Sequence, residues 1–319
     1  MSEKNPRALY GVLFIVVLFF IMLMGFAAFT VKSLKQEALG LKEFENGTGV
    51  IGVIKVEGVI MDSKEVVDLL NKANKNSSIK AILLRIDSPG GAVGPTQEIY
   101  EEIRRIDSAY NPDAKEGESK GKPIYASIGS IAASGGYYIS AATRKIYANA
   151  GSLTGSIGVI MQFMDASKLM EWAKVRPEIV KAGRYKDFGG PGRPLTDQER
   201  SMLETTLAGV HDQFRADILK QRKDKIHGDL VELSQGQIFS GEQAVKYGLV
   251  DEVAGLWEAG RRIGKELGFK DEAELKYIEK KKQGKFWDLL DNIEETSSSV
   301  KEWATSTKSA VPLYLYEGR

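Results

Sequence analysis

The chain has 319 residues, a formal net charge of +1 and no cysteine. The balanced charge argues against a general nucleic-acid binder, which normally carries a basic excess. Without cysteine, disulfides, thiolate catalysis and thiolate zinc sites are excluded. The only histidines are His211 and His227, so a site with several histidine ligands is nearly impossible. We therefore expect no metal and no cofactor.

The N-terminal segment is apolar enough to enter a membrane. No residue between Arg7 and Lys32 is charged. As a helix of about 22 residues, the segment 10–31 would span roughly 33 Å, enough to cross a bilayer. A cleaved signal peptide is the alternative, but its apolar core is usually about 7–15 residues long. We predict a short tail (1–9), a single transmembrane anchor (10–31) in the cell membrane and a charged spacer (32–49), with the domain that follows on the extracytoplasmic side.

From residue 50 onward, strand and helix patterns alternate, which predicts an α/β fold. The apolar run KAILLRID at residues 80–87 is typical of a parallel strand that is covered on both faces. The predicted strands are Val50–Val56, Lys80–Asp87, Pro123–Ile128, Lys145–Ala148, Ser156–Met161 and Glu178–Lys181. The predicted helices are Ser63–Lys75, Thr96–Ile106, Ile131–Thr143, Ala166–Lys174, Thr196–Lys223, Gly241–Tyr247 and Leu256–Leu267.

Several segments are predicted to lack regular structure. These are the turn SPGGAVG after residue 87, the polar loop Asp107–Lys122 and the Gly- and Pro-rich loop GRYKDFGGPGRPL at residues 183–195. We assign residues 50–295 to one domain and 296–319 to a flexible linker with an apolar tail, VPLYLYEGR. The tail has two interpretations: a structural clasp, or an extended peptide in a groove of its own chain or of a neighbouring copy.

A serine among small residues marks the end of a predicted strand. In SIGSIAASGGYY, Ser134 lies where a strand ends and a helix begins. The small neighbours would let a peptide backbone approach, and free N–H groups at a helix start suit a developing oxyanion. Tight packing between helix and sheet is the alternative interpretation, and this stretch alone favours it.

A second Gly-rich strand end follows Asp87, in the stretch DSPGG that contains Gly90 and Gly91. In open α/β sheets, ligand sites lie beyond the carboxyl ends of strands. An ordinary turn explains this stretch equally well by itself. Two Gly-rich strand ends in one sheet indicate a site more strongly than either alone.

Ser134 would need a base to become a nucleophile. His211 falls beside the apolar stripe of a long predicted helix, and His227 lies in the polar stretch DKIHGD, so neither is the favoured base. A buried lysine can lose its proton near neutral pH and replace histidine in this role. The residues alone do not choose among the lysines; Lys186 differs from the others in lying in the Gly-rich loop.

Four stretches, together with the N-terminal anchor, carry a resemblance to a known family: IDSPGG, GSIAASGGYYIS, LTGSIGV and GRYKDFGGPGRPLT. In combination they resemble the signal peptide peptidase A family in its short, single-repeat bacterial form. The resemblance covers nearly the whole chain. It implies a crotonase-like, Clp-protease-like fold and ring-shaped homo-oligomers. The loop Asn111–Lys122 looks longer than in the family, a departure that concerns the loop and not the site.

By the same resemblance, Ser134 is the expected nucleophile and Lys186 the general base. Gly91 and Gly135 are the expected backbone donors of the oxyanion hole, and Ser156 is the expected hydroxyl that holds the lysine amine. The implied function is a membrane-anchored serine endopeptidase that degrades cleaved signal peptides and similar apolar peptides. Two other classes stay open: a crotonase-type acyl-CoA enzyme and a non-catalytic membrane scaffold.

Overall fold

The computed structural model describes residues 17–27, 49–114, 119–279 and 313–315. The chain divides into two compact units, 1–48 and 49–319. In the first unit, residues 17–27 form a helix with exposed apolar side chains. Among the residues with a described structure, no helix has both the length and the apolar character needed to cross a membrane. The remainder of the predicted anchor, the tail 1–9 and the spacer up to residue 48 lie outside the described residues.

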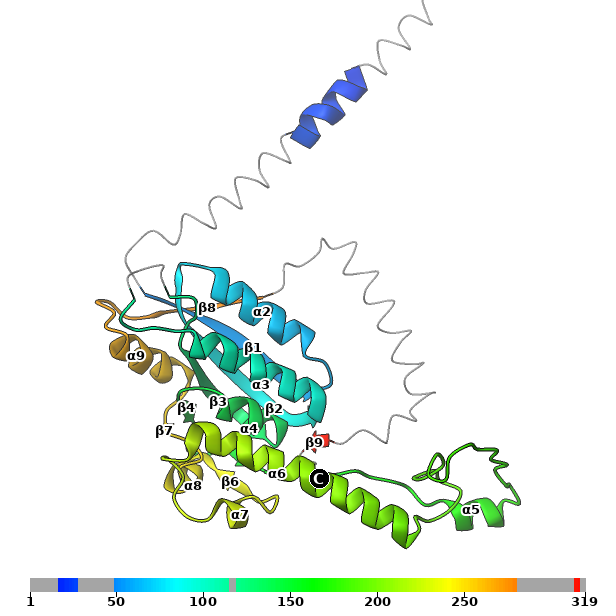
Figure 1. Cartoon of the computed structure of the whole chain (residues 1–319). Coiled ribbons are helices and arrows are strands. Elements are labelled where there is room, and N and C mark those ends of the chain that lie inside the picture. Colours follow the sequence, from blue (N-terminus) through cyan, green and yellow to red (C-terminus); the bar gives the residue numbers. More distant parts are fainter. Residues whose placement is uncertain (1–16, 28–48, 115–118, 280–312, 316–319) are drawn as a thin grey trace, which may run out of the picture. The chain divides into compact units, whose positions relative to one another are not determined.

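The second unit is a mixed α/β domain, as predicted (Figure 1). Its strands are β1 (Val50–Ile60), β2 (Ile79–Ala92), β3 (Ile124–Ala133), β4 (Ile146–Ala148), β5 (Leu153–Gly155), β6 (Ile238–Ser240), β7 (Glu252–Val253), β8 (Glu274–Tyr277) and β9 (Leu313–Leu315). Its helices are α2 (Lys64–Lys75), α3 (Val93–Ser108), α4 (Gly135–Ala141), α5 (Ser167–Trp172), α6 (Asp197–Arg222), α7 (Leu230–Leu233), α8 (Gly241–Lys246) and α9 (Leu256–Glu266).

Within the described residues, the nine strands form one sheet with the order β6-β5-β3-β2-β1-β8. β4 and β7 extend it from β3, and β9 pairs with β2. The pairs among β1, β2, β3 and β8 are parallel, whereas β5 with β6 and β2 with β9 are antiparallel. The centre of the sheet is therefore the buried parallel arrangement that the apolar strands predicted. The more specific likeness to crotonase and Clp-protease folds stays a prediction.

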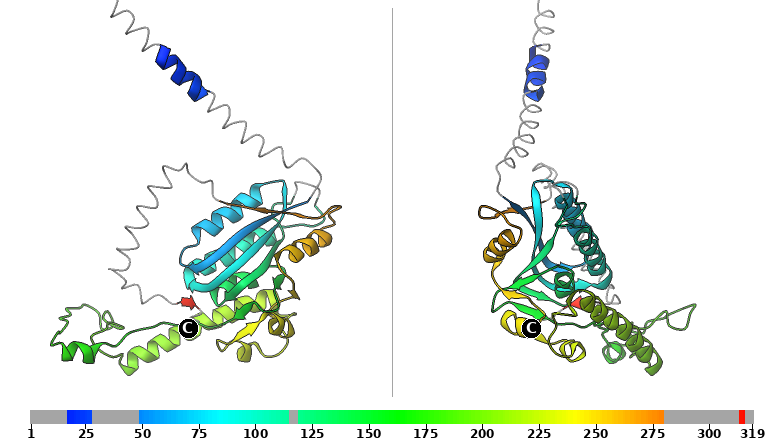
Figure 2. Two further views of the ribbon diagram at one scale, coloured as in Figure 1. Left: turned by 180° about the vertical axis from the view of Figure 1, so that it is seen from behind. Right: turned by 60° about the vertical axis from the view of Figure 1, so that its left-hand side comes forward.

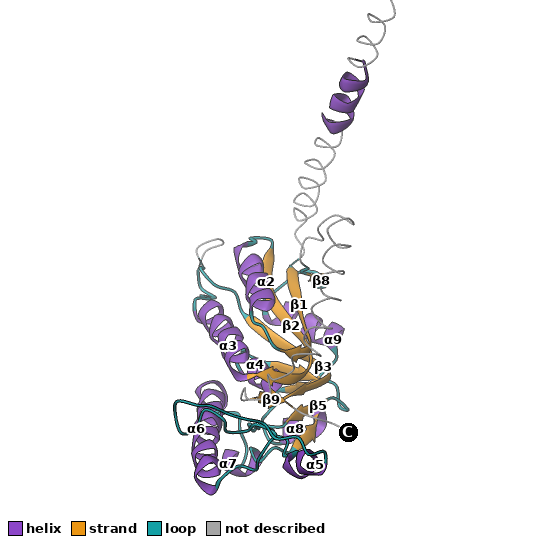
Figure 3. Ribbon diagram, turned by 90° about the vertical axis from the view of Figure 1, so that its right-hand side faces the viewer, coloured by secondary structure: helices purple, strands orange, loops and turns teal. Residues whose placement is uncertain are grey.

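Helices cover both faces of this sheet (Figures 2 and 3). α2 and α3 lie on one face and bury apolar side chains such as Leu70 and Ile103. On the other face, Ala259 and Ile263 of α9 pack in one cluster with Ile51, Leu83, Tyr125 and other buried residues of the sheet. Because the central strands are covered on both sides, residues 50–54 of β1 and 81–84 of β2 are apolar and buried without alternation.

Four predicted elements differ from the structure near the candidate site. The expected turn SPGGAVG begins as strand, because β2 runs on through both glycines to Ala92, paired with β1 and β9. The predicted helix Ile131–Thr143 begins only at Gly135, because β3 continues to Ala133 beside β5. The predicted strand Ser156–Met161 is wrong: the strand is Leu153–Gly155, and the left-handed φ of 49° at Ser156 ends it. Glu178–Lys181 is exposed and has no strand structure.

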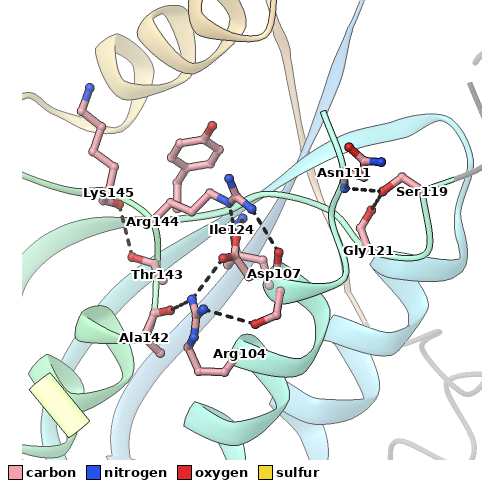
Figure 4. A network of polar contacts seen from close by, with 12 residues as sticks. Arg104, Asp107, Asn111, Ser119, Gly121, Ile124, Ala142, Thr143, Arg144 and Lys145 are labelled. Atoms are coloured by element: carbon pink, nitrogen blue, oxygen red, sulfur yellow. Dashed lines mark hydrogen bonds and ion pairs between the residues drawn. The ribbon is translucent and has the colours of Figure 1, made fainter. Parts of the chain in front are cut away.

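The predicted loop Asp107–Lys122 starts from a buried ionic network (Figure 4). Asp107, at the end of α3, accepts hydrogen bonds from Arg104 Nη1 at 3.0 Å, Arg144 Nε at 2.5 Å and the Ile124 amide at 3.0 Å. Asp107 is 3% exposed. Since a buried carboxylate needs such partners, this network joins α3 to the start of β3 and to the segment after α4. Residues 115–118 of the loop lie outside the described residues.

Candidate active site

Ser134 lies at the junction of β3 and α4, in a strained backbone conformation. Its φ is 53° and its ψ is −114°, a region that costs a non-glycine residue about 1–3 kcal/mol. The residue is 1% exposed, and its Oγ is buried with no hydrogen-bond partner in the described part of the chain. Its amide donates to the Gly155 carbonyl at 2.8 Å. A strained strand-to-helix turn is one of the ways in which enzymes position a nucleophilic serine.

Gly91 and Gly135 lie beside this serine. A Cβ at Gly91 would lie 2.0 Å from the Ile60 carbonyl oxygen, so only glycine fits between β1 and β2 at this point. A Cβ at Gly135 would lie 3.2 Å from the Gly91 amide nitrogen and 3.0 Å from Thr96 Oγ1. The start of α4 therefore packs directly on the Gly91 peptide unit. The structure brings together Ser134 and both glycines that the sequence singled out.

A strand from the C-terminal tail, β9, lies against the same peptide units. Leu315 pairs with Gly90, Tyr314 with Gly91 and Leu313 with Ala92, in antiparallel register. β9 also contacts α3 and α4. In this structure, the end of β2 thus accepts an extended peptide by main-chain pairing, immediately beside Ser134.

Ser156 occupies the next loop. It is 8% exposed, has a positive φ of 49°, and its amide donates to the Gln237 carbonyl at 2.7 Å. Since Gly155 accepts from the Ser134 amide, the loop that carries Ser156 is attached directly to the candidate nucleophile. Ser156 is therefore placed near Ser134, whereas its role toward a lysine stays a prediction.

Neither histidine makes a hydrogen bond to the Ser134 hydroxyl. His211 Nδ1 lies 3.4 Å from Arg215 Nη1, and burial, together with the Arg215 charge, lowers the pKa of the imidazole. His227 contacts the Lys246 carbonyl at 3.2 Å. The geometry agrees with the sequence analysis, which favoured neither of them as a base.

Lys186 lies on a segment that we call the α5 arm, residues 159–195, which contains α5. In Figure 1 this segment extends beyond the N-terminal end of α6. Lys186 is exposed, whereas the Ser134 hydroxyl is buried without a partner. Within the described part of the chain, Lys186 therefore makes no hydrogen bond to the Ser134 hydroxyl. No signal in the sequence indicated this.

The loop around Lys186 is nevertheless held in place by charge. Arg193 lies 3.1 Å from Asp187 and 2.6 Å from Glu199, and Lys181 forms an ion pair with Asp187. Hydrogen bonds from Arg193 lower the pKa of Asp187 and lower that of Glu199 to about 2. Glu199 also closes the predicted capping box with Thr196 at the start of α6. These contacts connect the Lys186 loop to a long helix.

In the described ranges, no group of three or more histidine and acidic side chains could hold a metal ion. The groups that the structure gathers at this site are a buried serine hydroxyl, backbone amides and a strand edge that pairs with peptide. Such an arrangement fits a peptide hydrolase of the serine class.

Comparison with known proteins identifies the class further. The profile of peptidase family S49 matches residues 116–270. A protein of Synechocystis named as a protease is 33% identical over 83% of this chain and 95% of its own length. A protein of Methanocaldococcus jannaschii with the same kind of name is 29% identical over 81% of this chain and 82% of its own length. A protein of Enterococcus faecium named as signal peptide peptidase A is 32% identical over 65% of this chain and 57% of its own length.

The chain belongs to peptidase family S49, as the resemblance to signal peptide peptidase A predicted, and is a serine-type peptidase.

Proposed function

We propose that the chain is a membrane-anchored endopeptidase in which Ser134 is the nucleophile and Lys186 the general base. The observation that carries this proposal is the Ser134 hydroxyl: buried, unbonded, on a strained turn and packed beside the Gly91 and Gly135 peptide units. A serine held in this way needs only a base and an oxyanion site to attack a carbonyl.

The substrate would bind as a strand on the edge of β2. The pairing of β9 with Gly90–Ala92 supports this mode, because a peptide in the same position would run antiparallel beside Ser134. Main-chain hydrogen bonds then supply affinity that does not depend on sequence. Apolar peptides are the substrates we propose, and cleaved signal peptides among them, in line with the name of the Enterococcus faecium relative.

Lys186 would come from a neighbouring copy of the chain. The α5 arm exposes large apolar side chains: Met164, Leu169, Trp172, Val175, Ile179 and Val180. Trp172 is 81% exposed and Val180 95% exposed, and a cluster of this kind marks an interaction surface. If the arm of one copy reaches the Ser134 region of the next, the contact is head-to-tail, and such contacts form a ring when the rotation between neighbours closes. This arrangement supports the predicted homo-oligomeric ring.

In the proposed reaction, the neutral Lys186 amine takes the proton of Ser134, and Oγ attacks the peptide carbonyl. The amides of Gly91 and Gly135 stabilise the oxyanion, an effect typically of about 3–4 kcal/mol per donor. The lysine then protonates the leaving amine, and water hydrolyses the acyl-enzyme. Ser156 would orient the amine. Anchoring by residues 10–31, with the domain on the extracytoplasmic side, would place the site near membrane-released peptides.

Probe labelling tests the nucleophile. A fluorophosphonate should label the wild type at Ser134 and should not label Ser134→Ala. Ser130→Ala is a matched control, because Ser130 is an exposed serine on the same strand. Absence of labelling in the folded wild type would favour the acyl-CoA enzyme. Absence of hydrolysis of any fluorogenic peptide would favour the scaffold.

Complementation tests the origin of the lysine. Ser134→Ala and Lys186→Ala should each be inactive alone. Co-assembled at equal amounts, they should regain activity at about a quarter of the sites, where an intact serine meets an intact lysine of the neighbour. If the dyad formed within one chain, every site would carry one lesion and the mixture would stay inactive.

A further inference from the structure

Ser88 forms a hydrogen-bonded bridge just before the glycine pair of β2. It is fully buried, at 0% exposed. Its hydroxyl donates to the Gly58 carbonyl of β1 at 2.6 Å and accepts from the Gly90 amide at 3.1 Å. One side chain therefore connects two strands at the point where β2 reaches the site.

The bridge lies at an irregularity of the sheet. Glu57 pairs with Asp87, but the next pair is Val59 with Gly90, so β2 contains one more residue than β1 between these pairs. Pro89 has no amide hydrogen to donate, and Gly58 and Gly90 have left-handed φ values of 73° and 107°. Regular pairing is thus interrupted here, and the Ser88 hydroxyl supplies hydrogen bonds in its place.

The Ser88 bridge lies directly before the Gly90–Gly91 peptide unit. The Gly90 amide that bonds the Ser88 hydroxyl belongs to the preceding Pro89–Gly90 unit, and the hydroxyl also lies 3.5 Å from the Gly90 carbonyl oxygen, which belongs to the Gly90–Gly91 unit. The Gly91 amide nitrogen lies against Gly135, at the start of α4. The Ser88 carbonyl also packs on α4, since a Cβ at Gly136 would lie 2.7 Å from it. Ser88 therefore contacts β1, the Gly90 turn and α4 together.

We propose that Ser88 is a positioning residue for the oxyanion hole: its hydroxyl holds the Pro89–Gly90 peptide unit, from which the Gly90–Gly91 unit follows, so that the Gly91 amide points at the scissile carbonyl oxygen. This inference rests on the proposed function, in which the Gly91 amide is a donor. Ser88 itself does not touch the substrate.

The test compares Ser88→Ala with Ser140→Ala. Ser140 is a matched control, because it is also 0% exposed and its hydroxyl also bonds a backbone carbonyl, that of Gly136 at 2.8 Å, on the helix next to the site. For Ser88→Ala, kcat should fall about 10- to 100-fold with KM nearly unchanged, since one oxyanion donor is misdirected rather than lost. Ser140→Ala should stay close to wild type, and Ser88→Thr, which keeps a hydroxyl, should recover part of the loss.

The ratio of the rates with two substrates distinguishes a misplaced oxyanion donor from a general structural defect. Each enzyme is assayed with a peptide ester and with the matching thionoester, whose sulfur is a poor hydrogen-bond acceptor. The preference for the oxygen ester should fall by about tenfold in Ser88→Ala, and this ratio does not depend on how much of the sample is folded. If Ser88→Ala does not fold, Ser88→Cys, which keeps the volume with a weak donor, serves instead.

An unchanged preference in a Ser88 variant, with wild type labelled at Ser134, would overturn the Ser88 inference and leave the proposed function intact. A wild type that the fluorophosphonate does not label would overturn the proposed function itself.

Discussion

The Ser134 amide donates a 2.8 Å hydrogen bond to the Gly155 carbonyl, which fixes the candidate nucleophile to the loop that begins with Ser156. β3 and β5 are paired up to this point, Ala133 with Gly155. Any movement of the Ser156 loop would therefore be transmitted to the strained turn at Ser134. Ser134 and Ser156, the candidate nucleophile and the residue expected to orient the base, are therefore joined directly, whereas Lys186, the proposed base, lies on the α5 arm.

Removing the amine of Lys186 should abolish most of the activity, because the proposed mechanism needs a base to take the serine proton. Lys186→Ala should lower the rate by about 10³-fold or more, and Lys168→Ala, a substitution of an exposed lysine on α5, should leave it unchanged. A folded Lys186→Ala that keeps the wild-type rate would contradict a lysine base.

Deleting Pro312–Arg319 should lower the apparent KM for a short peptide. In this structure, β9 occupies the edge of β2 at Gly90–Ala92, and a tethered strand competes at an effective concentration of about a millimolar. Replacing Leu313–Leu315 with three serines keeps the chain length and should act in the same direction. If the truncated protein dissociates into smaller species and its apparent KM is unchanged, the tail is a structural clasp.

Asp107→Ala should destabilise the domain strongly. The carboxylate is buried and accepts from Arg104, Arg144 and the Ile124 amide. Its removal takes the acidic partner from two arginines, which keep bonds to backbone carbonyls, and leaves the Ile124 amide without its partner. We expect a loss of about 3 kcal/mol in the free energy of unfolding, measured by denaturant titration. Asp113→Ala, at an exposed position in the same loop, should change it by less than about 0.5 kcal/mol. Equal effects of the two variants would contradict the role of the network.

Lys122 should make stability rise with pH in the alkaline range. This lysine is 9% exposed, and burial, with a smaller effect of Lys80, lowers its pKa from 10.5 to about 8. Between these two values the unfolded chain binds more protons than the folded chain, so raising the pH favours folding. The gain is at most about 3 kcal/mol.

The measurement is the free energy of unfolding from pH 8 to 10.5, compared with Lys122→Met. Lys122→Met should lack the rise, and Lys120→Met, a substitution of an exposed neighbour, should keep it. If the free energy of unfolding changes with pH in the same way in all three proteins, Lys122 is not the source of the rise in stability.

Much of the fold and part of the site could be predicted from the sequence. Apolar runs such as residues 80–87 indicated the central parallel strands, because covered strands need no polar face. The small residues around Ser134 and the glycine pair after Asp87 marked both strand ends, because close backbone approach restricts residue type over a few neighbouring positions. These signals are local, so they can be recognised without the tertiary structure.

The remaining features depend on contacts between distant parts of the chain. The extra residue in β2 exists only relative to β1, and for that reason the sequence predicted a turn where the structure has a strand bridged by Ser88. The pairing of Leu313–Leu315 with Gly90–Ala92 joins segments more than two hundred positions apart. The exposure of Lys186 is likewise a tertiary property: no local pattern specifies whether a Gly-rich loop folds back onto its own domain, because that depends on the surface available to it.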